Sequence, residues 1–167
     1  MGEALAYLLT WTTYGTWLPG DRRGWVNRHR KRGQGPQGPS PALESHAGGL
    51  MKGAPVILDP EMRRSADAAM RQACVDFGWV LHALEVRSNH VHAVVTAGDA
   101  SPGKVMGILK VRGTRALREM GPGAGRDRWW TREGSKRILN TPGSVEGAIR
   151  YVMNHDAWVK APRTAWG

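Results

Sequence analysis

The sequence predicts an α+β protein of the ferredoxin-like (RRM-like) class, with helices packed on one face of an antiparallel sheet. Three observations predict this class. The expected elements follow the order strand, helix, strand, strand, helix, strand, helix. The two central strands are joined by the short connection 87–89, which is typical of an antiparallel hairpin. The chain has 167 residues, which suits one domain, and the last helix is an addition that carries Tyr151.

The first half of the chain contains one strand, one long insertion and one helix. Residues 4–13 are apolar and rich in strand formers, and turn residues follow them up to Asp21. Residues 22–55 form a basic, Gly/Pro-rich insertion. Since a loop of this length in a small domain tends to be functional or disordered, we expect it to be ordered mainly when it binds its partner. Asp59 and Pro60 then begin a helix that ends near Phe77.

The second half supplies the remaining elements. Residues 79–86 and 90–96 are the strands of the central hairpin. A second helix covers about 101–120 and is broken by the glycines that follow. Residues 129–139 include a short strand or hairpin, and a final helix covers about 141–157. One domain, residues 1–167, is therefore expected.

Composition limits the partners and the compartment. The net charge is +10 with a pI near 10.6, which suits a polyanion, and nucleic acid is the first candidate. The single cysteine, Cys74, excludes a disulfide framework or a cysteine-rich zinc site within one chain. No apolar run could span a bilayer and no secretory signal is visible, so we expect a cytoplasmic, nucleoid-associated protein without a membrane partner.

The chemistry is expected at the motif His90-Val91-His92. On a strand, side chains alternate, so the two histidines share one face and Val91 points to the other. Two imidazoles on one face form half of a site for a divalent ion such as Mg²⁺ or Mn²⁺. The alternative is a histidine pair on a half-buried strand, satisfied by hydrogen bonds.

The final helix supplies the other candidate residues. Val145, Ile149 and Val152 form its buried stripe, whereas Tyr151 and His155 are one turn apart on another face. His155 could be a third nitrogen ligand, and the Tyr151 phenol could attack phosphorus as a covalent nucleophile. A metal ion would polarise a phosphate oxygen, and the phosphotyrosine product would keep the linkage reversible. Alternatively, Tyr151 is a packing residue and His155 a cation at the helix end.

The sequence resembles the HUH single-tyrosine transposases of bacterial insertion sequences, and most closely the REP-associated tyrosine transposases. The resemblance rests on His90-Val91-His92 and on residues 10–21, 130–137 and 148–152. It implies nicking and joining of single-stranded DNA, often a hairpin formed by a palindromic repeat. It also implies a metal bound by the two HUH histidines and by the residue four positions after the tyrosine. Asn or Gln is usual there, so His155 departs from the family and Asp156 is the alternative. Family members act as homodimers or as monomers.

Basic residues interleaved with tryptophan are the expected DNA contacts, since phosphates bind cations and bases stack on aromatic rings. The candidates are Arg22, Arg23, Arg28, Arg30, Lys31, Arg32, Lys110, Arg112, Arg128, Trp129, Arg132, Lys136 and Arg137. Trp129 or Trp130 could stack on an unpaired base, although one of the two is expected in the core. A solvated basic surface is the alternative for each run.

Other functions on this fold are less well supported. A nucleic-acid-binding module without catalysis would need the basic and aromatic groups, but not a converging His90, His92 and Tyr151. A two-histidine phosphoesterase needs two His-x-Thr/Ser motifs, which are absent from the sequence. A zinc deaminase needs a pair of cysteines, and the chain has one.

Overall fold

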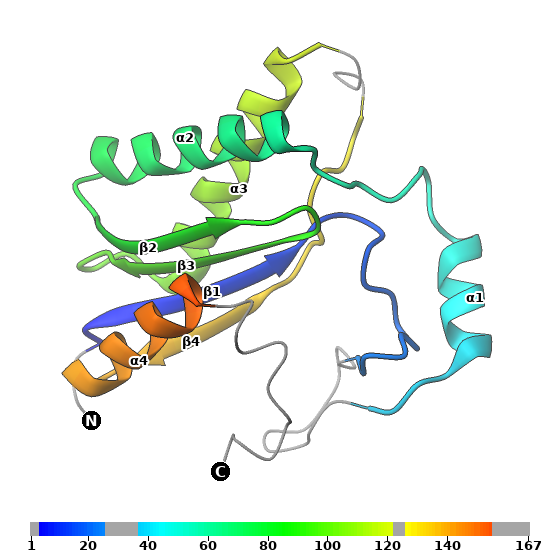
Figure 1. Cartoon of the computed structure of the whole chain (residues 1–167), viewed down its shortest axis with the longest axis horizontal. Coiled ribbons are helices and arrows are strands. Elements are labelled where there is room, and N and C mark those ends of the chain that lie inside the picture. The colour runs from blue at the N-terminus through cyan, green and yellow to red at the C-terminus, as the bar shows by residue number, and fades with distance from the viewer. Residues whose placement is uncertain (1–3, 26–36, 122–125, 155–167) are drawn as a thin grey trace.

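The structure, a computed structural model, describes residues 4–25, 37–121 and 126–154. Its centre is a four-stranded antiparallel sheet in the order β2-β3-β1-β4 (Figure 1). The strands are β1 (Ala6–Thr12), β2 (Val80–Val86), β3 (His90–Thr96) and β4 (Ser135–Leu139). The ferredoxin-like prediction is therefore confirmed, including the hairpin formed by β2 and β3.

Helices α2 (Pro60–Asp76) and α3 (Pro102–Glu119) cover one face of the sheet (Figure 1). Each begins where the sequence indicates, because the side chains of Asp59 and Ser101 accept hydrogen bonds from the backbone N–H three residues later. Alternate strand residues such as Leu9, Trp11 and Val91 point into the core beneath these helices. This core fixes which strand residues face the other way.

The added helix α4 (Pro142–Met153) lies on the opposite face of the sheet from α2 and α3 (Figure 1). A capping box between Thr141 and Ser144 begins it. Its buried residues Ala148 and Val152 pack on Val94 of the central strand, in a second apolar cluster. The sheet thus has a helix on each side, and α4 brings Tyr151 to the face that bears the histidines.

The sequence analysis missed one helix within the insertion. Residues 41–49 of the Gly/Pro-rich stretch form helix α1 (Pro41–Gly49), which stands apart from the sheet (Figure 1). Pro41 occupies the first turn, yet no α1 residue is buried. Helical periodicity of apolar residues is produced by a buried face, so a helix without one has no such signal. In the described residues, no helix is both long enough and apolar enough to cross a bilayer.

The segment after β1 folds back on α1 through Gly20. Its φ of +93° lies in the left-handed region, and its carbonyl accepts the Ser40 N–H at 2.8 Å. A Cβ at this position would overlap the Ser40 carbonyl oxygen and the Glu44 backbone nitrogen. The segment containing residues 13–25, named here the β1–α1 loop, therefore has a defined conformation that requires glycine.

Gly20→Ala is expected to destabilise the protein more than Gly78→Ala. Both glycines have a positive φ, but nothing lies within 4 Å of a Cβ at Gly78. Gly78→Ala should therefore lose about 1 kcal/mol of unfolding free energy, whereas Gly20→Ala adds a backbone clash and should lose at least about 2 kcal/mol. Urea denaturation measures the free energies, and hydrogen exchange at the Ser40 amide locates the change. Equal losses would contradict the packing of Gly20 on α1.

Candidate active site

The two histidines of the motif lie side by side on the face of the sheet that carries α4. Their ring centroids are 4.8 Å apart, and the rings are nearly perpendicular at 75°. Across the β1–β3 pairing, His90 is opposite Thr12 and His92 is opposite Thr10. Val91 points into the other core and is fully buried. The alternation predicted from the sequence is therefore what places both imidazoles together.

Hydrogen bonds at Nδ1 orient both rings. His92 Nδ1 is 2.8 Å from Thr10 Oγ1, and His90 Nδ1 is 2.7 Å from Asn89 Oδ1. An oxygen partner at Nδ1 is the usual support of a metal-binding histidine, because it fixes the ring and makes Nε2 the nitrogen that binds the metal. His92 is also only 3% exposed, so its ring is held by packing as well. The two oriented imidazoles of His90 and His92 are therefore suited to bind a divalent metal ion.

Tyr151 completes the cluster from α4. Its ring centroid lies 5.3 Å from that of His92, at an interplanar angle of 77°. Half-burial between α4 and the sheet raises the pKa of the Tyr151 phenol above its usual value, so the hydroxyl is protonated. Predicted residues His155 and Asp156 lie outside the described residues. The structure thus brings together three of the four predicted catalytic and metal-binding side chains.

Glu85 is a neighbour of this cluster that the sequence analysis missed. It is paired with His92 across the β2–β3 hairpin and so shares the histidine face. Its carboxylate Oε1 lies 3.2 Å from Arg87 Nε in an ion pair. Counting back through the connection 87–89 could have found this pairing. Among the residues that the structure describes, no group of three His, Cys, Asp or Glu side chains is arranged to hold a metal ion.

The predicted basic residues of the insertion divide into two groups. Arg22 is exposed, and Arg23 forms an ion pair with the buried Asp21. That guanidinium holds the pKa of the Asp21 carboxyl below its usual value. The other predicted contacts of this run lie outside the described residues: Arg28, Arg30, Lys31 and Arg32.

Around β4, four predicted cations are exposed: Arg128, Arg132, Lys136 and Arg137. Arg137 is opposite Leu8 of β1 and therefore lies on the face of the sheet that carries the histidines. Lys136 is on the other face, 3.8 Å from Glu133. Arg137 is thus the β4 cation best placed to meet a strand that enters the site.

Three predicted contacts are placed differently from the expectation. Trp129 is 4% exposed and Trp130 is 8% exposed, so both rings belong to the core and neither offers a face to a base. Arg112 pairs with Asp76 of α2, Nη1 to Oδ2 at 2.9 Å. Lys110 Nζ donates to the carbonyl oxygens of residues 131, 132 and 133. We therefore leave Lys110, Arg112 and Trp129 out of the DNA interface.

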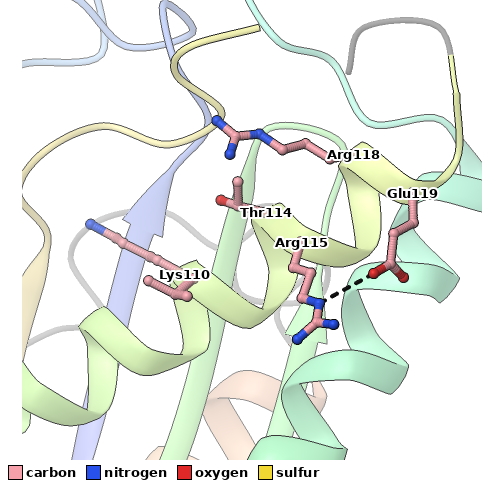
Figure 2. A pocket seen from close by; sticks show the side chains of 6 residues that line it. Lys110, Thr114, Arg115, Arg118 and Glu119 are labelled. Carbon is pink, nitrogen blue, oxygen red and sulfur yellow. Dashed lines mark hydrogen bonds and ion pairs between the residues drawn. The ribbon is translucent and has the colours of Figure 1, made fainter. Parts of the chain in front are cut away.

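Lys110 lies at one end of a shallow pocket on α3 (Figure 2). In this view its side chain points away from Arg115 and Arg118, which line the same pocket (Figure 2). Burial and the neighbouring Lys136 lower the Lys110 pKa from 10.5 to about 8. Because the Lys110 ammonium group donates hydrogen bonds to three carbonyls and has a lowered pKa, we assign it a structural role.

Lys110→Met is expected to change how stability depends on pH. The folded-state pKa is about 8 and the ordinary value is 10.5, so the folded protein binds fewer protons between them. Lys110 then contributes stability that is complete above pH 10.5 and is lost as pH falls through 8. The unfolding free energy of the wild type minus that of K110M should rise by about 1–2 kcal/mol from pH 7 to pH 9.5, after screening. Urea denaturation at these pH values measures it, and a constant difference would contradict the burial of the charge.

Comparison with known proteins identifies a family and two solved structures of similar fold. Residues 50–155 match the family model described as transposase IS200 like. A candidate transposase from Deinococcus radiodurans R1 shares the fold with a TM-score of 0.51 and 14% identity, over 92% of both chains. A REP-associated tyrosine transposase bound to a REP hairpin gives a TM-score of 0.52 and 12% identity, over 96% of this chain and 72% of that chain. No curated protein sequence matches the chain.

Proposed function

Because the chain belongs to the IS200-like transposase family, we propose that it is a metal-dependent single-stranded DNA endonuclease and strand transferase. It acts through a covalent 5′-phosphotyrosine intermediate. The observation that carries the proposal is the cluster of His90, His92 and Tyr151, in which side chains of β3 and α4 meet on one face of the sheet. Packing alone does not require two histidines with oriented rings beside a tyrosine ring.

The proposed step exchanges one phosphodiester for another. The Tyr151 oxygen attacks phosphorus, the bond from phosphorus to the 3′ oxygen breaks, and a 5′-phosphotyrosine and a free 3′ hydroxyl result. The phenol proton is lost from the attacking oxygen and a proton is gained by the leaving oxygen. Since one phosphate ester replaces another, the reverse attack by a 3′ hydroxyl rejoins DNA. This reversibility suits strand transfer better than hydrolysis.

The histidines would hold the metal. His90 and His92 would bind Mg²⁺ or Mn²⁺ through Nε2, with Thr10 and Asn89 fixing the rings through Nδ1. His155 is the proposed third ligand, with Asp156 as the alternative. When bound, the ion polarises a phosphate oxygen and neutralises charge that develops at phosphorus.

The proposed substrate is single-stranded DNA near a hairpin formed by a palindromic repeat. The relative bound to a REP hairpin supports this choice. In this chain, the exposed Arg137 lies on the histidine face, and Arg128, Arg132 and Arg22 are exposed in the adjoining segments. Such cations neutralise phosphates and provide affinity without reading the sequence. The protein could act as a monomer or as a homodimer.

A covalent adduct tests the proposal. The protein is incubated with Mg²⁺ or Mn²⁺ and labelled single-stranded DNA from the flanks of its own gene, and then run on a denaturing gel. We expect a band in which the label has moved to the mass of the protein plus a DNA fragment, and none with EDTA. Tight binding to every flank without any adduct would instead support the alternative function, a non-catalytic nucleic-acid-binding module on the same fold.

A further inference from the structure

One aromatic ring in the β1–α1 loop is exposed and yet held in place. The Trp17 side chain is 42% exposed. Its ring is nevertheless fixed, because Nε1 donates a hydrogen bond to the Gly24 carbonyl at 2.7 Å. The Arg23 guanidinium carbon lies 4.5 Å from the ring centroid, in cation–π contact. Isolated exposed tryptophans need no explanation, but a ring braced at its edge and against its face is oriented for a partner.

Arg23, which supports the Trp17 ring, is held by the buried carboxylate of Asp21. Arg23 Nε donates to Asp21 Oδ1 at 2.8 Å, and its backbone N–H donates to the same oxygen at 2.8 Å. Asp21 is 5% exposed, so the carboxylate cannot move without losing these bonds. Arg23 Nη2 also donates to the Thr16 carbonyl at 2.7 Å. The guanidinium therefore connects Thr16 to Asp21 within the loop and supports the face of the Trp17 ring.

The same loop is bonded to the turn that carries the candidate metal site. The Asn89 carbonyl accepts hydrogen bonds from the Thr13 N–H at 2.8 Å and from Thr16 Oγ1 at 3.4 Å. Asn89 Oδ1 is the partner of His90 Nδ1, so one residue connects the loop to the motif. Trp17 follows Thr16 directly in the chain. Trp17 is therefore part of a loop that is hydrogen-bonded to the residue before His90.

We propose that Trp17, supported by Arg23, is a stacking site for one unpaired base of the DNA strand that enters the active site. The inference rests on the proposed function and deepens it. Aromatic rings are the usual platforms for unpaired bases, since every base has a π face. Arg22, which precedes Arg23 in the chain, is exposed and is suited to bind an adjoining phosphate. Trp17 is therefore the tryptophan proposed to stack on a base, in place of Trp129, which is buried.

Abasic scanning of the substrate tests this site. The probe is a hairpin with a single-stranded flank taken from beside the gene, in which each unpaired base is replaced in turn by an abasic residue. For the wild type, we expect one position at which loss of the base weakens binding by about 5- to 100-fold. Trp17→Ala should lower affinity for the intact probe by a similar factor and become insensitive to the abasic residue at that position. Trp17→Phe should keep most of the sensitivity.

A matched control is available at the far end of α2. Phe77 directly follows α2, is 45% exposed and stacks on Trp79 with ring centroids 4.9 Å apart. The C-terminal end of α2 lies on the other side of the molecule from the β1–α1 loop (Figure 1). Phe77→Ala should leave binding and the abasic profile unchanged. If Trp17→Ala weakens intact and abasic probes equally, or has no effect, the stacking site is refuted. An adduct without Trp17-dependent base sensitivity would refute this inference alone, whereas base sensitivity without any adduct would refute the proposed function alone.

Discussion

Tyr151→Phe is expected to abolish the covalent protein–DNA adduct, with a loss of at least about a thousandfold in rate. The substitution removes only the hydroxyl, which is the proposed nucleophile. The phenyl ring can keep its contact with His92, whose centroid is 5.3 Å away, and the packing of α4 on the sheet is unchanged. DNA binding should therefore stay within about threefold of the wild type, because the phosphate contacts are made elsewhere. A denaturing gel measures the adduct, and fluorescence anisotropy measures the binding.

The other two tyrosines are the controls for this prediction. Tyr14 accepts the Lys52 N–H through its hydroxyl at 3.0 Å, and Tyr7 is buried in the core under α2 and α3. Tyr14→Phe and Tyr7→Phe should both form the adduct. An adduct that persists in Tyr151→Phe and disappears in one of the controls would assign the nucleophile to that other tyrosine. Mass spectrometry of the adduct peptide identifies the modified residue directly.

Features that depend on local sequence were predictable. The caps Asp59 and Ser101 begin their helices where their residue types indicate, because capping involves only neighbouring backbone. The shared face of His90 and His92 follows from strand geometry alone. The proximity of Tyr151 to His92 needed more than spacing. It was expected from the resemblance to a family, and the structure adds that α4 crosses the sheet on the histidine side.

Features that depend on partners distant in sequence were not predictable. In the sequence, Lys110 resembles any exposed basic residue of a helix. Only in the fold does the Thr131 carbonyl accept a hydrogen bond from its ammonium group. Glu85 becomes a neighbour of His92 only through the register of the hairpin. The braced ring of Trp17 depends on a hydrogen bond to the Gly24 carbonyl and on the Asp21–Arg23 pair. Such contacts have no periodic signal in the sequence.

His92→Ala and His90→Ala are each expected to abolish metal-dependent adduct formation, by at least about a hundredfold. The reason is that each removes one of two imidazoles whose rings are fixed by Thr10 and Asn89. Metal binding gives a readout that is independent of DNA cleavage. Isothermal titration with Mn²⁺ should show a saturable site in the wild type and none in either variant, while binding of the DNA hairpin without metal is retained.

The same two variants decide between a metal site and a pair of structural histidines. His92 is 3% exposed and bonded to Thr10, so His92→Ala should also lose about 1–3 kcal/mol of unfolding free energy. His90 is more exposed, and His90→Ala should lose less than about 1 kcal/mol. His82→Ala is the control, since His82 is exposed and makes a hydrogen bond of the same kind to Thr96 at 2.8 Å. If His90→Ala folds normally and still binds Mn²⁺ and forms the adduct, the histidines are structural. If it folds normally and loses both, packing cannot explain the loss, because the rest of the sheet is intact.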